Sequence, residues 1–311
     1  MTSTLTPPPA SPPPPAPEEL AHDLSQRRSG RTIRNGLATV LMGLAFVIVV
    51  VPLALVLITV ISKGAQAISW AFLTEDIPPV RRSGPGMGPA VVGTLVITGT
   101  AALMAIPLGV LGAIYLHEYG QQGRLAQLLR FLADVMTGVP SIIMGLFIFS
   151  IWVVRFGTSG VTGFAGALAL ACLMLPIIIR STEEMLRLVP DQQREASVAL
   201  GASKARTTLT IVLPAAFPGI LSGVLLAVAR AAGETAPLLF TIGAATSTNW
   251  NPFKGPNTAL SVQIFQNATQ PFPAAQERAW GAALTLIVLT FILLVLSRLV
   301  AGRFDPARRN R

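Results

Sequence analysis

The sequence predicts an all-α membrane protein with about six transmembrane helices. Of its 311 residues, 52% are hydrophobic and 12% are charged, whereas a soluble domain carries roughly 25% charged residues. Six apolar stretches without Asp, Glu, Lys or Arg each exceed the roughly 18 residues that a membrane-crossing helix needs. A further uncharged stretch, 235–253, is rich in Thr, Ser, Asn and Gly and is not counted. Within lipid, a single segment satisfies its backbone polar groups only as a helix. The stretches are 35–62, 83–116, 135–154, 156–179, 207–229 and 279–297.

Residues 1–35 differ in composition from the rest of the chain. They contain the proline runs 7–9 and 12–15 and show no apolar periodicity, which predicts an extended, disordered proline-rich tail. The first apolar stretch is too long for the apolar region of a signal peptide, so we interpret it as an uncleaved anchor. Residues 36–311 are then expected to form one six-helix transmembrane domain.

The positive charges predict the orientation in the membrane. Sixteen of the 23 Lys and Arg residues lie in the loops on the side of the two termini, six lie in the opposite loops, and Arg230 ends the fifth stretch. Because cytoplasmic loops are enriched in Lys and Arg, both termini are expected in the cytoplasm. The net charge of +9 is therefore explained by the cytoplasmic loops of a membrane protein, and no nucleic-acid partner is expected.

Prolines and the single cysteine fall within the apolar stretches. Pro52, Pro107, Pro140 and Pro176 are expected to kink transmembrane helices, which tolerate proline better than soluble helices do. Cys172 has no second cysteine with which to form an internal disulfide or a metal cluster.

The patterns of common enzymes are absent from the sequence. It contains no G-x-x-x-x-G-K-[ST], no H-E-x-x-H and no G-x-S-x-G, and its two histidines are His22 and His117. We therefore predict no catalytic residues, no metal site and no bound cofactor. The long loops 63–89 and 236–278 are either docking surfaces or simple connectors.

The charged segment between the fourth and fifth stretches predicts two short helices joined by a turn. Pro190 and Asp191 suit a helix start, Gly201 a helix end, and Ser203 the cap of a second helix. Such a compact knob suits insertion into a groove on another protein, and a solvated loop is the alternative. Its small apolar face would comprise Ala196, Ala199 and Leu200.

This segment resembles the EAA loop, E-A-A-x-x-x-G-x9-I-x-L-P, of permeases of type I ABC importers. Ser197 stands where the pattern has its second alanine, and its small side chain should be accommodated. The resemblance implies a type I importer fold with a coupling loop, 181–213, that docks into a cytoplasmic ATPase subunit. That subunit would bind ATP and Mg²⁺. The residues expected to carry the coupling are Glu195, Ala196, Ser197, Gly201, Ser203, Lys204, Ile211, Leu213 and Pro214.

A second informative segment, 228–241, follows the fifth stretch. Arg230 and Glu234 are four residues apart and would share a helix face, while Gly233 and Pro237 predict a break in the helix. An ionisable residue at membrane depth usually faces a cavity, and a guanidinium matches the oxygens of phosphate. We therefore interpret Arg230, Glu234 and Thr235 as a substrate pathway. A structural ion pair at the outer interface is the alternative.

The run from Ala229 to Phe240, A-R-A-A-G-E-T-A-P-L-L-F, resembles the signature of permease subunits of phosphate importers. Ala236 and Pro237 separate it from the partner permease, PstC, which usually has Met after Gly-Glu-Thr. Residues 137–142 and 145–147 also resemble this group, and the likeness covers about 90–301, whereas the proline-rich tail departs from it.

The resemblance implies a subunit that moves inorganic phosphate across a bacterial cell membrane and does not itself hydrolyse ATP. Its expected partners are a homologous PstC-like permease, two PstB-like ATPase subunits and an extracytoplasmic PstS-like phosphate-binding protein. A permease for sulfate, molybdate or a peptide remains an alternative. A secondary transporter would need carboxylates at mid-membrane, whereas Asp134 and Glu234 lie near the ends of stretches. An intramembrane enzyme lacks the residues for catalysis.

Overall fold

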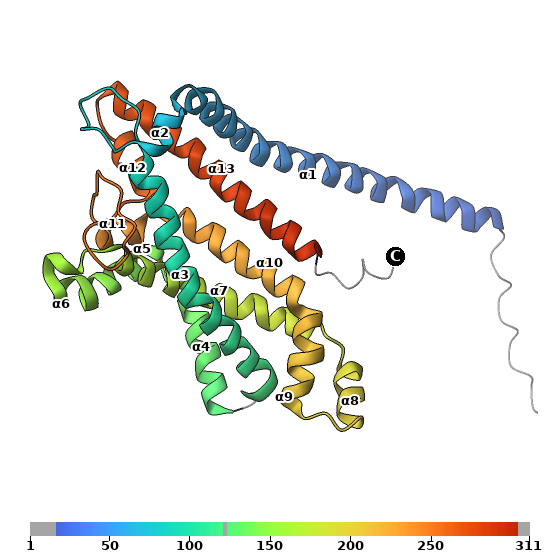
Figure 1. Ribbon diagram of the computed structural model, residues 1–311. Helices are drawn as coiled ribbons and strands as arrows, with labels where there is room; N and C mark the ends of the chain where they lie inside the picture. The colour runs from blue at the N-terminus through green and yellow to red at the C-terminus, as the bar shows by residue number, and fades with distance from the viewer. Residues whose placement is uncertain (1–16, 121–122, 304–311) are drawn as a thin grey trace, which may run out of the picture. The chain divides into compact units, whose positions relative to one another are not determined.

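The computed structural model describes residues 17–120 and 123–303, and these residues form helices and connecting loops without a strand (Figure 1). The chain divides into two compact units, residues 1–58 and 59–311. The described part of the first unit belongs to the long helix α1 (Pro17–Ala67), whose residues 34–58 are almost entirely exposed. The helix continues through Pro52 without a break.

Helix α1 begins earlier than the sequence interpretation expected. We expected an extended tail up to residue 35, but the helix starts at Pro17. Proline suits the first turn of a helix, and residues 18–34 are rich in the helix-favouring Glu, Leu, Ala, Gln and Arg. The proline runs before residue 16 lie outside the described residues.

Among the described residues, six helical segments are long and apolar enough to cross a membrane, and each coincides mainly with one predicted stretch. The prediction of an all-α protein with six spans is therefore confirmed. The segments are Arg34–Ala67, Gly88–Gly120, Ser141–Gly160, Gly163–Arg187, Lys204–Ala232 and Pro273–Leu296.

Several spans combine α-helix with short π- or 3-10 segments, and short helices connect them. After α1 the elements are α2 (Trp70–Thr74), α3 (Gly88–Ile114), η1 (Tyr115–Gly120), α4 (Arg124–Gly138), α5 (Ser141–Ile148), η2 (Phe149–Val153), α6 (Val154–Phe156), η3 (Gly157–Gly160), α7 (Gly163–Arg187), α8 (Asp191–Ala199), α9 (Lys204–Thr207), η4 (Thr208–Val212), α10 (Leu213–Ala232), α11 (Ala236–Thr241), α12 (Leu260–Ala268) and α13 (Pro273–Arg303).

The main core of the second unit lies where α3, α7 and α10 pack together (Figure 1). Ile97, Leu170 and Ile178 are fully buried there. Small residues let the helices approach closely, as is usual between membrane helices. A Cβ added to Gly109 on α3, for example, would lie 2.7 Å from Ile178 Cγ2 on α7.

Pro140 does not kink a continuous span as predicted. It precedes the first residue of α5, and α4 ends at Gly138. A proline disfavours the α conformation of the residue before it, and Val139 is accordingly extended, with φ −76° and ψ 128°. The third span therefore begins at Ser141. The other two prolines, Pro107 and Pro176, lie inside α3 and α7.

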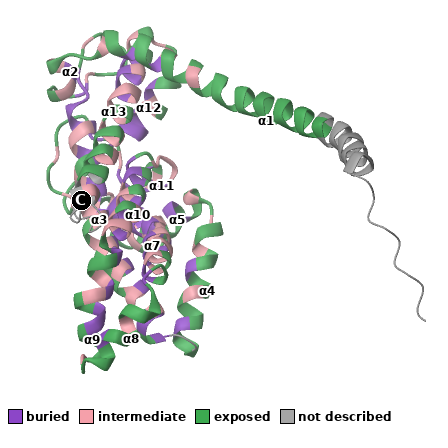
Figure 2. Ribbon diagram, turned by 90° about the vertical axis from the view of Figure 1, so that its right-hand side faces the viewer, coloured by how far each residue is buried: buried purple, intermediate pink, exposed green. Residues whose placement is uncertain are grey.

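The loop 63–89 is a packed structure with its own small core. Phe72 in α2, Met87 just before α3, and Leu260 in α12 are fully buried and belong to one cluster with Ala282 of α13. Helices α2, α12 and α13 lie near one another in Figure 2. The guanidinium of Arg278 on α13 is buried beneath this loop and donates hydrogen bonds to the carbonyl oxygens of Arg82 at 2.9 Å and Val80 at 3.2 Å. These contacts hold the loop against the start of α13.

Candidate functional site: the coupling loop and the break between α10 and α11

The segment between α7 and α10 has the predicted helix–turn–helix geometry. Helix α8 begins at Asp191, and Gly201 adopts φ +85°, which glycine tolerates better than any other residue. Ser203 precedes α9, and its Oγ accepts a hydrogen bond from Arg206 N at 3.4 Å. The turn therefore places α8 and α9 as two separate short helices at one end of the second unit (Figure 1).

Most of α8 is exposed, including the predicted apolar face. Glu195, Ala196 and Ala199 are exposed, and Leu200 just after the helix is 91% exposed. Ser197, which departs from the EAA pattern, is buried, and its Oγ lies 2.9 Å from Thr207 Oγ1 in α9. The serine is accommodated as expected, and it adds a polar contact that alanine could not make.

The remaining predicted coupling residues lie on α9, η4 and α10. Lys204 is exposed, and its Nζ lies 5.3 Å from the ring centroid of Tyr119 in η1. Ile211 and Leu213 are half-buried, Leu213 packs against the main core, and Pro214 is exposed in the first turn of α10. The loop is thereby continuous with the fifth span.

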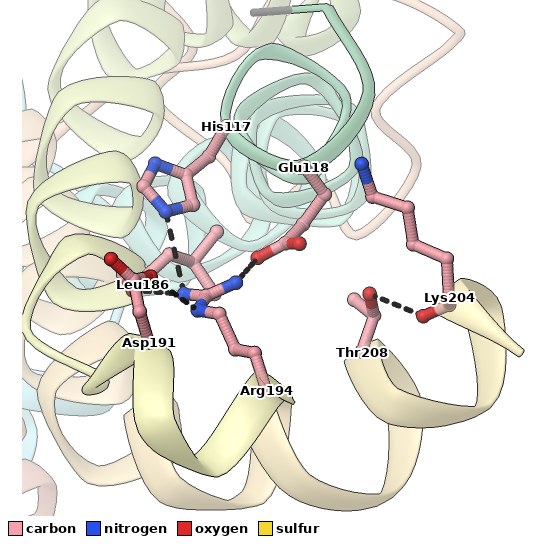
Figure 3. Close-up of polar contacts among 7 residues, drawn as sticks. All are labelled: His117, Glu118, Leu186, Asp191, Arg194, Lys204 and Thr208. Atoms are coloured by element: carbon pink, nitrogen blue, oxygen red, sulfur yellow. Dashed lines mark hydrogen bonds and ion pairs between the residues drawn. The ribbon is translucent and has the colours of Figure 1, made fainter. Parts of the chain in front are cut away.

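A cleft of about 370 Å³ is lined by residues of η1, α8, α9 and η4, most of which are polar or charged. Arg194 extends from α8 into it, forms an ion pair with Glu118, and lies with Nη2 3.4 Å from His117 Nε2 (Figure 3). The same Nη2 donates to the carbonyl oxygen of Leu186 in the last turn of α7 at 2.7 Å. The sequence interpretation missed this cluster because Arg194 and Glu118 are 76 positions apart.

Two further arginine–carboxylate pairs lie near this end of the second unit. Arg130 on α4 binds Glu183 on α7 through Nε at 2.9 Å, and its Nη2 donates to the carbonyl oxygen of Leu116 in η1 at 2.8 Å. Arg180 on α7 pairs with Asp134 on α4. Asp134, one of two carboxylates that the sequence placed near a span end, is thus ion-paired.

The predicted helix break lies between α10 and α11. Helix α10 ends at Ala232, and α11 begins at Ala236 after the half-buried Thr235. Glu234 lies in the break rather than on α10, so the two residues do not share a helix face, but Arg230 Nε and Glu234 Oε1 are 3.8 Å apart. The side chain of Arg230 is 70% exposed and that of Glu234 is 20% exposed. The structure therefore brings the three predicted pathway residues together beside the break.

Helix α11 packs closely against α5, and the residue Glu234 before it is bound by α12. A Cβ on Gly145 in α5 would lie 2.5 Å from Pro237 Cα. Ser261 Oγ on α12 donates to the backbone carbonyl oxygen of Glu234 at 2.7 Å. The segments 137–147 and 229–240, which carry the resemblance to phosphate importers, are thus neighbours in space. The packing leaves no space for a side chain at Gly145.

Metal ligation finds no support in the described part of the chain, where no group of three or more His, Cys, Asp or Glu side chains could hold an ion.

Residues 105–310 match the family model described as "binding-protein-dependent transport system inner membrane component". The chain is 44% identical over 285 residues to the phosphate transport system permease protein PstA 1 of Mycobacterium tuberculosis, covering 90% of this chain and 91% of the relative. It is 40% identical over 268 residues to the phosphate transport system permease protein PstA of Yersinia pestis, covering 86% and 88%.

Solved ABC transporters share the fold. A bacterial alginate ABC transporter in complex with an alginate-bound periplasmic protein aligns with TM-score 0.63 and 13% identity, covering 90% of this chain and 99% of the other. The MetNI methionine transporter in an inward-facing conformation aligns with TM-score 0.54 and 19% identity, covering 70% and 94%. The chain therefore belongs to the family of binding-protein-dependent transport system inner membrane components, in the group of the PstA permease proteins.

Proposed function

We propose that this chain is one permease subunit of an ATP-driven importer of inorganic phosphate, and that Arg230, Glu234 and Thr235 line the phosphate path. One observation carries the proposal: an arginine in an apolar span leaves most of its side chain exposed beside a helix break. A guanidinium at such a position favours an anion, and its planar donors match phosphate oxygens.

The distance between Arg230 and Glu234 supports a role in binding rather than in structure alone. At 3.8 Å the two groups attract each other but are too far apart for a hydrogen bond. Glu234 can hold the guanidinium in position while its N–H groups remain available to an anion. The negative charge of Glu234 would also weaken phosphate binding, which keeps release fast.

The exposed face of α8 supports a coupling role. Glu195, Ala196 and Leu200 are exposed on a short, well-defined helix, which suits docking into a groove of an ATPase subunit. In this proposal the partner ATPase binds ATP and Mg²⁺, and this chain has no hydrolytic residues. The partners are a homologous PstC-like permease, two PstB-like ATPases and a PstS-like phosphate-binding protein.

The proposed location is a bacterial cell membrane, with both termini in the cytoplasm. The excess of Lys and Arg on the side of α8 and the termini supports this orientation. The relatives named as phosphate transport permeases in two bacteria support the choice of phosphate over other anions.

The test is uptake of labelled phosphate at micromolar concentration in cells that lack this chain, with sulfate and molybdate uptake measured in parallel. We expect loss of phosphate uptake alone, restored by the wild-type chain and by Arg155→Ala, whose arginine is exposed on α6. Arg230→Ala should assemble but fail to restore uptake. Normal uptake with Arg230→Ala would refute the pathway, and loss of another anion instead would refute the substrate.

A further inference from the structure

We propose that Arg194 is a positioning residue that transmits the movement of α8 to α3 and α7. The proposal rests on the proposed function, because it assumes that α8 is the helix that an ATPase subunit moves. It adds a residue outside the EAA pattern, and it specifies which transmembrane helices respond to α8. The argument depends on how α8 is attached to the rest of the second unit.

Apolar packing contributes little to the attachment of α8. Ser197 is its one buried residue, and that side chain contacts α9 through a hydroxyl pair. Val198 is 56% exposed although it is apolar. A helix with so little apolar burial gains little hydrophobic stabilisation. Its position relative to the membrane helices therefore depends on polar contacts, and Arg194 makes the strongest of them.

Arg194 connects α8 to two other segments through one rigid group. Its side chain is 17% exposed, and Glu118, its partner in η1, is 7% exposed. The guanidinium also donates to Leu186 O at 2.7 Å in the last turn of α7. Because a guanidinium is planar and its donors have fixed directions, α8 cannot shift without changing its bonds to both segments (Figure 3).

The segment that Arg194 contacts is a π-helix, a form often found at functional sites. Segment η1 extends α3 from Tyr115 to Gly120. Arg130 from α4 also contacts η1: it donates to Leu116 O at 2.8 Å and pairs with Glu183 on α7. The end of α3 is thus held by two arginines, one from α4 and one from α8. A displacement of α8 therefore changes the contact of Arg194 with η1 relative to that of Arg130.

The experiment uses the complete importer, reconstituted in vesicles with its binding protein. The quantity measured is the number of anions carried per ATP hydrolysed. Arg194→Lys retains the positive charge but loses the planar fork, and Glu118→Gln retains the shape but loses the negative charge. The control is Arg124→Lys, an exposed arginine at the start of α4. Subunit stoichiometry in the purified complex is measured for every variant.

We expect the ratio to fall about fivefold or more in both variants, as for a typical coupling between sites, with unchanged stoichiometry and an unaffected control. In the double variant the ratio should fall no further than in the worse single variant, because both substitutions break the same contact. A residue that only supports the fold would lower uptake and ATP hydrolysis together. An unchanged ratio, additive losses, or loss of the ATPase from the complex would overturn the proposal.

Failure of the substrate assignment would be seen separately. If the wild-type importer carries an anion other than phosphate, that result appears before any variant is examined. The ratio is then measured with that anion, and the role of Arg194 is tested unchanged.

Discussion

The two ends of the second unit are held together by different kinds of contact. We call the first the coupling-loop end: η1, α8, α9 and the adjoining parts of α4 and α7. The second, the opposite end, comprises α2, the loops 75–87 and 242–259, α12 and the start of α13 (Figure 1). At the coupling-loop end, arginine–carboxylate pairs join separate elements.

The opposite end relies on backbone groups and on close packing. Arg278 is 3% exposed and binds carbonyl oxygens of the loop 75–87. Thr94 Oγ1 on α3 accepts a hydrogen bond from Leu260 N on α12 at 2.9 Å. A Cβ on Gly93 would lie 1.9 Å from the carbonyl oxygen of Thr258. These contacts leave little space for the backbone to move.

The difference indicates which end can change shape. The exposed ion pair of Arg180 with Asp134 is worth little in stability, and side chains in ion pairs can exchange partners, whereas a close-packed backbone cannot shift without steric clash. We therefore expect substitutions at the opposite end to reduce stability strongly. A substitution in the turn of the coupling-loop end should reduce stability less while impairing transport. Four predictions test this contrast, each by SDS-induced unfolding of the purified protein in detergent micelles.

The largest loss of stability is expected for Gly93→Ala. Alanine favours a helix by about 1 kcal/mol over glycine, but here its Cβ would collide with the Thr258 carbonyl. We expect a net destabilisation of about 3 kcal/mol, the upper end of overpacking costs. Gly99→Ala on the same helix is the control, because nothing lies within 4 Å of its added Cβ. Equal stability of the two variants would contradict the close packing of this end.

A smaller loss is expected for Arg278→Met. Methionine fills the volume but leaves the carbonyls of Val80 and Arg82 without their donor. Hydrogen bonds to a charged group contribute about 1.5–3 kcal/mol, so we expect a loss of about 2 kcal/mol and faster proteolysis within the loop 75–87. Arg155→Met, at an exposed arginine, should change neither. Unaltered proteolysis of Arg278→Met would show that the loop is held by other contacts.

At the coupling-loop end, Gly201→Ala should cost about 1 kcal/mol. The cost comes from the positive φ of +85°, which a Cβ disfavours, since no atom lies within 4 Å of the added group. Uptake should fall more than this stability loss explains, because the angle between α8 and α9 changes. Gly138→Ala has equal free space and serves as the control. Full uptake by Gly201→Ala would show that coupling does not depend on the conformation of this turn.

The smallest effect is expected for Ser197→Ala, which restores the second alanine of the EAA pattern. It removes the hydroxyl contact with Thr207 at 2.9 Å, and a typical hydrogen bond contributes about 1 kcal/mol or less. Thr207→Val and the double variant complete a cycle that isolates the pair. The double variant should lose less than the sum of the single variants. Strict additivity would mean that the two hydroxyls do not interact.

The sequence predicted the spans better than their ends. Apolar stretches without charge identify membrane helices because charge is expensive in lipid, and all six were found. The break before Pro140 was missed because freedom from charge says nothing about backbone conformation. The start of α1 at Pro17 was also missed, because the residues after the proline runs were grouped with those runs although their composition favours a helix.

In the candidate site, too, some features could be predicted from the sequence and others could not. The helix–turn–helix of the coupling loop and the break after Arg230 depend on nearby residues, so local pattern sufficed to predict them. The pair of Arg194 with Glu118 depends on how α3 and α7 pack, which a single sequence does not display. A charged Glu118 directly after an apolar stretch was the available signal, because such a residue needs a partner.

The exposure of Arg230 has a consequence for the chain on its own. A bilayer around an isolated copy would place lipid against a guanidinium that is 70% exposed within an apolar span, at a cost of at least about 2.5 kcal/mol. The surface that carries Arg230 is therefore unsuited to lipid. This surface of the single chain is suited to the interior of a multi-subunit assembly. A lone copy should therefore be short-lived in the membrane.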